Sequence, residues 1–207
     1  MRIFDCFMYF DEEIVLETRL NYLNPYVDYF VIVESSFTHR GEVRELRFNI
    51  DKFAEFKDKI IYKVYNQIPD KVEEILKNDD ENIKSHKYIM NAVYRENAQR
   101  NYLLEGLSKA QDDDLILISD VDEIPNFENF NFENNKNKKL IFKQKLFYYK
   151  FNLNLPNYDW YGSKACRVKD LHSITDLRNI KTKKYDWWRV DTLFKKNKFI
   201  NLKIINN

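Results

Sequence analysis

The sequence is short of glycine and cysteine, and it contains no long hydrophobic run. Its three glycines, Gly41, Gly106 and Gly162, lie far apart, which excludes the glycine-rich loops of P-loop and dinucleotide-binding proteins. Cys6 and Cys166 are its two cysteines, too few for a disulfide framework and suited to a reducing compartment. No apolar segment approaches the roughly 20 residues of a membrane span, and no signal peptide is recognisable. We therefore expect a cytoplasmic protein.

The chain also lacks a large net charge. Its formal net charge is +1, so nucleic acid is not an expected partner. Hydrophobic residues make up 44% and aromatic residues 16% of the 207 residues, which excludes a disordered chain. No repeat or low-complexity linker divides the sequence. We expect a single domain over residues 1–207.

Apolar and amphipathic segments alternate along the chain and predict an α/β fold with a largely parallel sheet flanked by helices. Apolar runs predict strands at residues 2–10, 27–35, 59–65, 114–119 and 139–155, and a last strand near 198–205. Residues 11–25 have the pattern of an amphipathic helix, and a short helix is expected near 171–180. Residues 66–85 are polar and are expected to form a loop with a short helix. A long helix is predicted over residues 86–110, and its expected inward face consists of Ile89, Val93, Leu103, Leu104 and Leu107.

The stretch "LILISDVDEIP" places three acidic residues directly after a buried strand. If the backbone stays extended, Asp120 and Asp122 lie on one side, at the strand end where open α/β sheets bind ligands. Two carboxylates on one side repel each other unless a cation joins them, and Mg²⁺ or Mn²⁺ prefers such oxygen ligands. The pattern therefore predicts a divalent metal site. The alternative is that the acidic residues cap the following turn.

Two arginines precede the acidic stretch on the predicted long helix. Arg95 and Arg100 could hold phosphate oxygens, since a guanidinium group matches them geometrically. The alternative is an ion-pair face, because Glu96 and Arg100 are four residues apart. Near the C-terminus, "TKKYDWWRVDTLFKKNK" mixes basic and aromatic residues, which allows at most a peripheral membrane contact. A solvated edge explains that segment equally well.

Several segments together resemble glycosyltransferase family 17, which includes the β-1,4-mannosyl-glycoprotein N-acetylglucosaminyltransferases. They are "IFDCFMYFDEEIVLETRLNYL", "VDYFVIVESSFTHRGEVRELRF", "RENAQRNYLLEGL", "DDDLILISDVDEIP" and "DWYGS". The resemblance implies a GT-A-like nucleotide-diphospho-sugar-binding fold with a mostly parallel central sheet. It also implies inverting transfer of a sugar, N-acetylglucosamine in the family's named members, from a UDP-sugar to a hydroxyl group of a glycan or glycolipid acceptor.

The resemblance also implies roles for individual residues. Asp120 and Asp122 would hold the metal, Mn²⁺ or Mg²⁺, beside the donor diphosphate. The implied donor-binding residues are Glu34, Arg95, Arg100 and Asp120, with Glu34 near the nucleoside; the alternative for Glu34 is a strand-end cap. Trp160 could stack on the acceptor sugar, or it could belong to the core. The candidates for the general base are Glu123 and Asp159, because each is close to one of these motifs, and the alternative is a base in the family's further C-terminal segment.

One departure from the family pattern is visible at the C-terminal end. Family members carry a further segment with a Trp-His pair beyond the point where this sequence stops, and the three histidines, His39, His86 and His172, do not match it. The resemblance therefore implies a C-terminally short relative. Two alternatives stay open: a non-catalytic nucleotide-sugar-binding domain, and a nucleotidyl or phosphoryl transferase that uses the same paired acids.

Overall fold

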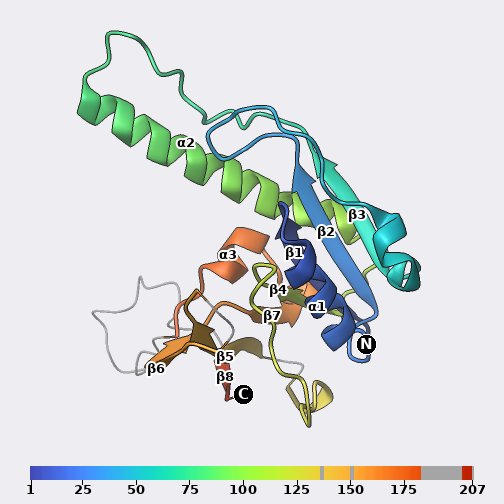
Figure 1. Ribbon diagram of the computed structural model, residues 1–207. Helices are drawn as coiled ribbons and strands as arrows, with labels where there is room; N and C mark the ends of the chain where they lie inside the picture. Colours follow the sequence, from blue (N-terminus) through green and yellow to red (C-terminus); the bar gives the residue numbers. More distant parts are fainter. Residues whose placement is uncertain (136–137, 150–151, 183–201, 207) are drawn as a thin grey trace.

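The computed structural model describes residues 1–135, 138–149, 152–182 and 202–206 (Figure 1). These residues form a mixed α/β fold around one eight-stranded sheet, in which the strand order is β3-β2-β1-β4-β7-β5-β6 and β8 pairs with β5. The strands are β1 (Ile3–Tyr9), β2 (Tyr29–Ser35), β3 (Ile60–Tyr65), β4 (Leu115–Ile118), β5 (Lys139–Phe147), β6 (Asn154–Trp160), β7 (Lys164–Arg167) and β8 (Leu202–Asn206). The helices are α1 (Glu13–Leu23), α2 (Glu81–Asn101) and α3 (Ile174–Arg178). Short 3₁₀ turns are η1 (Ile50–Phe56), η2 (Tyr102–Gly106), η3 (Glu133–Asn135) and η4 (Val168–Asp170).

The two halves of the sheet differ in strand direction. Strands β3, β2, β1 and β4 run parallel, as the apolar runs near the N-terminus predict. In the other half, β7 is antiparallel to both β4 and β5, β6 is antiparallel to β5, and β8 runs parallel to β5. The expectation of a mostly parallel sheet thus holds only for the first half. The reason is that β6 and β7 follow β5 after short connections, which favour antiparallel neighbours.

The parallel half is buried on both faces. Alternate residues of β1 point to opposite sides: Phe7 joins the hydrophobic cluster under α1, and Phe4 joins the cluster under η2 and α3. The first cluster receives Leu16, Leu20 and Leu23 from α1. Burial on both faces explains why these strands are continuous apolar runs instead of alternating patterns.

Helix α2 starts and ends earlier than the helix predicted at residues 86–110, and the residues that it buries differ from the predicted ones. Asp80 caps its N-terminus by accepting a hydrogen bond from the backbone N–H of Ile83. Figure 1 shows that its first half projects beyond the sheet, together with the loop that precedes it. The predicted inward residue Ile89 is accordingly 64% exposed. Val93 and Leu104 are exposed as well, whereas Leu103 is buried and Leu107 packs against the same hydrophobic cluster, so the predicted inward face is wrong along α2 and right for two residues beyond its end. Polar residues, among them Gln99 and Arg100, are the buried ones instead.

The remaining predicted elements fall close to their expected places. The long strand predicted at residues 139–155 contains β5 and only the first two residues of β6, which is antiparallel to β5. Helix α3 is shorter than predicted, and Ser173 caps it by accepting a hydrogen bond from the N–H of Asp176. Most of the basic, aromatic segment at 182–198 lies outside the described residues. Among the residues that are described, no helix is long and apolar enough to cross a membrane.

Candidate active site

The three acids after β4 form a tight turn, which we call the acidic turn (residues 120–123). The backbone N–H of Glu123 donates to the carbonyl of Asp120 at 3.0 Å. The Glu123 carboxylate in turn accepts from the N–H of Asp120 at 2.8 Å. The backbone is therefore not extended here, so the condition under which the sequence placed Asp120 and Asp122 on one side of a strand is not met. The three carboxylates instead differ in burial: Glu123 is buried, Asp120 is half-buried and Asp122 is exposed.

A fully buried arginine binds the backbone of the acidic turn. Arg19 of α1 forms two hydrogen bonds with the equally buried carboxylate of Asp5 in β1, at 2.6 and 2.8 Å. Its other terminal nitrogen donates to the backbone carbonyls of Asp120, Val121 and Glu123 at 3.0–3.2 Å. One guanidinium group thus fixes the backbone of the turn through hydrogen bonds that its positive charge strengthens.

A second arginine links the acidic turn to the second half of the sheet. Arg178, at the end of α3, forms a two-pronged pair with Glu123 at 2.7 and 2.8 Å and donates to Oδ2 of Asp120 at 2.7 Å. Trp160 Nε1 also donates to Glu123, at 2.6 Å. A Cβ atom at Gly162 would overlap both the Glu123 carboxylate and the Trp160 ring. The glycine of "DWYGS" is therefore required by this close approach.

Arg100 of α2 approaches Asp120 from the opposite side. It donates to Oδ1 of Asp120 at 3.0 Å and pairs with Glu96 at 2.7 Å. Both oxygens of Asp120 are therefore bound by guanidinium groups, Oδ1 by Arg100 and Oδ2 by Arg178. The predicted ion pair between Glu96 and Arg100 is present, and it adjoins the acidic turn.

Asp122 is the carboxylate of the acidic turn that makes no ion pair within the part of the chain that is described. Its pKa is raised, first because surrounding protein atoms reduce its hydration and then because the charges of Glu123 and Asp120 are close. An exposed carboxylate whose ionised form is disfavoured by its surroundings is a candidate for binding a cation.

Two pockets adjoin the acidic turn, and Asp120 and Asp122 line both of them. The first, here the α2 pocket, has a volume of about 800 Å³ and lies at the carboxyl end of β1, between residues 38–42 and the last turns of α2. The second, here the β5–β6 pocket, has a volume of about 760 Å³. Its lining includes Glu123, Lys145, Tyr149 and Trp160. Both volumes are typical of small-molecule sites, so two ligands could meet at the acidic turn.

Three of the predicted site residues do not line either pocket. Glu34 is fully buried, and its carboxylate accepts from the N–H groups of Arg47 and Phe48 and from the hydroxyl of Tyr62. It anchors the loop that follows β2. Arg95 donates to the carbonyl of His39, and Asp159 pairs with Lys143 at 2.9 Å on the exposed face of β6.

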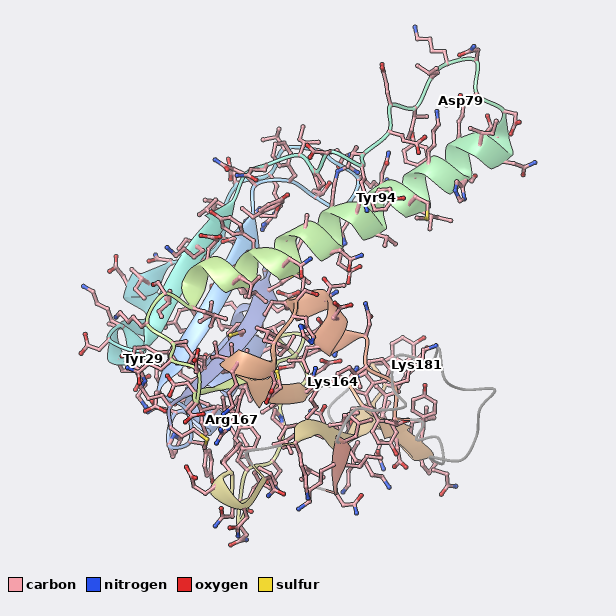
Figure 2. All side chains as sticks on the ribbon, turned by 180° about the vertical axis from the view of Figure 1, so that it is seen from behind. Tyr29, Asp79, Tyr94, Lys164, Arg167 and Lys181 are labelled. Atoms are coloured by element: carbon pink, nitrogen blue, oxygen red, sulfur yellow. The ribbon has the colours of Figure 1, made fainter. Side chains whose placement is uncertain are left out.

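Reasoning from the sequence missed Arg19, Arg178 and Lys164. Lys164 of β7 is buried next to α3 (labelled in Figure 2), where its ammonium group donates to the carbonyl of Arg178. Burial, followed by the positive charge of Arg178, lowers the pKa of Lys164 to about 8. Two basic residues, Lys164 and Arg167, enclose the two apolar residues of this four-residue strand, and nothing in that pattern singles out Lys164.

The depressed pKa of Lys164 predicts a pH-dependent stability difference. At this side chain the unfolded state binds more protons than the folded state between pH 8 and 10.5, so the contribution of Lys164 to the free energy of unfolding rises with pH in this window. Lys164→Met removes this group. We expect its stability relative to wild type to fall by about 2 kcal/mol between pH 7 and about pH 9.5, as measured by urea unfolding. An equal difference at both pH values would contradict the assignment.

Fold and site together define a mixed α/β protein with two adjoining pockets at the end of its parallel strands, where proteins of this class bind ligands. The sequence profile of Glycosyltransferase family 17 matches residues 1–182. The chain belongs to this family and is a glycosyltransferase, so in general terms it uses a sugar donor and a glycan acceptor. No curated protein and no solved structure matches the chain significantly.

Proposed function

We propose that the chain is a metal-dependent, inverting glycosyltransferase with a GT-A-like fold. It moves a sugar, N-acetylglucosamine by family resemblance, from a UDP-sugar to a hydroxyl group of a glycan or glycolipid. The observation that carries this proposal is that Asp120 and Asp122 line both pockets. Sugar transfer brings a donor and an acceptor together, and two pockets that share the same carboxylates can hold both substrates at one place.

The donor occupies the α2 pocket in this proposal. Arg100 is its buried cation and can bind the diphosphate, while Arg40 of the loop at 38–42 adds a positive charge at the pocket lining. Arg95 supports this loop from α2 through the His39 carbonyl. Glu34 acts from outside the pocket, because it anchors the backbone at Arg47 and Phe48 that follows the same loop.

A divalent cation, Mn²⁺ or Mg²⁺, fits the acidic turn if the donor supplies ligands too. Among the described residues, no cluster of three or more His, Cys, Asp or Glu groups is arranged to hold a metal. Asp122 is available, and Asp120 becomes available when it releases one guanidinium group. Cations of this kind are commonly held by one or two carboxylates together with substrate phosphates and water. When bound, the cation would neutralise the negative charge of the departing diphosphate.

The acceptor occupies the β5–β6 pocket, where the Trp160 ring is 36% exposed and can contact a sugar face. Its hydroxyl oxygen forms the new bond to the anomeric carbon, and the bond from that carbon to the diphosphate breaks, leaving its electron pair on the diphosphate. A carboxylate takes the hydroxyl proton. Of the two predicted bases, Glu123 lines this pocket and Asp159 does not. Glu123 has to give up one of its present hydrogen bonds to accept the proton.

The proposal is tested by incubating the protein with a panel of nucleotide sugars, Mn²⁺ and β-mannoside acceptors. We expect UDP release and a β-linked product from UDP-N-acetylglucosamine, since inversion of the α-linked donor gives a β linkage. The linkage is read by nuclear magnetic resonance. Nucleotidyl or phosphoryl products would support the phosphoryl-transfer alternative. Binding of UDP without any turnover would support a non-catalytic binding domain.

A further inference from the structure

The two guanidinium groups on Asp120 make it unavailable to a cation in the free protein. Arg100 occupies Oδ1 at 3.0 Å and Arg178 occupies Oδ2 at 2.7 Å. The acidic turn is therefore already neutralised in part by the protein itself, and Asp122 is its carboxylate without an ion pair among the described residues. A cation that needs Asp120 as well must displace at least one arginine.

The surroundings of the two arginines differ. Arg178 makes its two-pronged pair with buried Glu123, also donates to the carbonyl of Gly162, and lines neither pocket. If it left, Glu123 would remain buried and unpaired, which is costly. Arg100 lines the α2 pocket, and its other partner, Glu96, has a side chain that is 37% exposed. Arg100 is therefore the group that can change partners at low cost.

We propose that Arg100 is a positioning residue that couples binding of the cation to binding of the nucleoside diphosphate. In the free protein it occupies Asp120. When a nucleoside diphosphate enters the α2 pocket, the phosphate oxygens replace Asp120 as the partner of Arg100. Oδ1 of Asp120 is then free to bind the cation, while Arg178 keeps the other oxygen in place. This inference rests on the proposed function, because it assumes a diphosphate in the α2 pocket.

Removal of Arg100 should change Mn²⁺ affinity in a direction that a purely structural role of Arg100 would not produce. Loss of a structural contact should weaken every ligand. Loss of a competitor for Asp120 should instead strengthen binding of the cation alone and reduce the benefit that UDP gives to cation binding. Coupling between two ligands is reciprocal and commonly amounts to 5- to 150-fold, which calorimetry can resolve.

The test is calorimetric titration of Mn²⁺ with and without saturating UDP, on wild type and Arg100→Gln. We expect Arg100→Gln to bind Mn²⁺ alone about tenfold more tightly than wild type. The coupling factor, which is the ratio of Mn²⁺ affinity with UDP to that without UDP, should be smaller than in wild type by a similar amount. The association of Mn²⁺ with UDP in solution is the same for all variants and cancels in the comparison. Lys87→Gln is the control, because it removes one positive charge from α2 at its pair with Asp79, remote from the sheet (Figure 2).

A double-mutant cycle separates partner exchange from a general effect of removing positive charge. In an Asp120→Asn background, partner exchange predicts that Arg100→Gln adds nothing to Mn²⁺ affinity, whereas a general charge effect would persist. The inference is overturned if wild type binds Mn²⁺ and UDP together but Arg100→Gln does not gain affinity for Mn²⁺ alone, or if the gain survives without Asp120. Failure of wild type to bind UDP under any condition would instead overturn the proposed function, and the inference with it.

Discussion

Asp122→Asn is expected to lower the rate of sugar transfer by at least roughly a hundredfold, because it removes the available carboxylate that faces both pockets. The amide keeps the size of the side chain but cannot supply a negatively charged ligand to a cation. The measurement is the initial rate of UDP release with Mn²⁺ and acceptor at saturation. Asp112→Asn is the matched control, since this exposed acid precedes β4 and lines neither pocket.

The same substitution should leave stability unchanged or slightly increased. The pKa of Asp122 is raised in the folded protein, so the folded state binds more protons than the unfolded state, and ionisation of this group near neutral pH opposes folding. Removing the charge relieves that opposition. A rate equal to that of Asp112→Asn would contradict the assigned role, and a large loss of stability would show that Asp122 is a structural residue instead.

Arg19→Met is expected to destabilise the fold by about 3–5 kcal/mol, which is the usual cost of removing one partner of a buried ion pair. The substitution leaves the Asp5 carboxylate buried without its cation, and the carbonyls of the acidic turn lose their common donor. Urea unfolding at neutral pH measures the effect.

Two further variants isolate the reason for this loss. Lys52→Met removes the partner of Glu13, also on α1, in a pair whose side chains are about half exposed, at 52% and 48%. It should cost less than about 1 kcal/mol. The double variant Asp5→Asn with Arg19→Met removes the unpaired charge and should recover part of the stability lost by Arg19→Met. A loss in Arg19→Met no larger than that in Lys52→Met would contradict the structural role of the buried pair.

The parallel half of the fold was predictable because its strands are buried on both faces and read as apolar runs. The antiparallel half was harder, since apolar and aromatic residues continue past the end of β5, and the predicted strand at 139–155 ran through the turn and included only the first two residues of β6. The inward face of α2 could not be predicted from periodicity. Its first half projects beyond the sheet, so Ile89 has no core to enter although its spacing fits.

The site was predictable where its residues are contiguous, and less so where they come from distant segments. The acidic residues and Arg100 stand out in the sequence. Arg178 lies 55 residues from Glu123 along the chain, and nothing local in a short helix indicates such a contact. Asp5 and Arg19 did leave a signal: each is a single charge within an otherwise apolar strand or helix face. Opposite charges in two such places are an indication of a buried pair.

The most direct measurement is calorimetric titration of UDP into the protein with and without Mn²⁺, on wild type and Asp122→Asn. The account predicts that wild type binds UDP more tightly by at least about tenfold when Mn²⁺ is present. It also predicts that Asp122→Asn loses this enhancement while remaining folded. UDP binding that is independent of both Mn²⁺ and Asp122 would contradict the claim that the acidic turn holds a cation against the donor diphosphate.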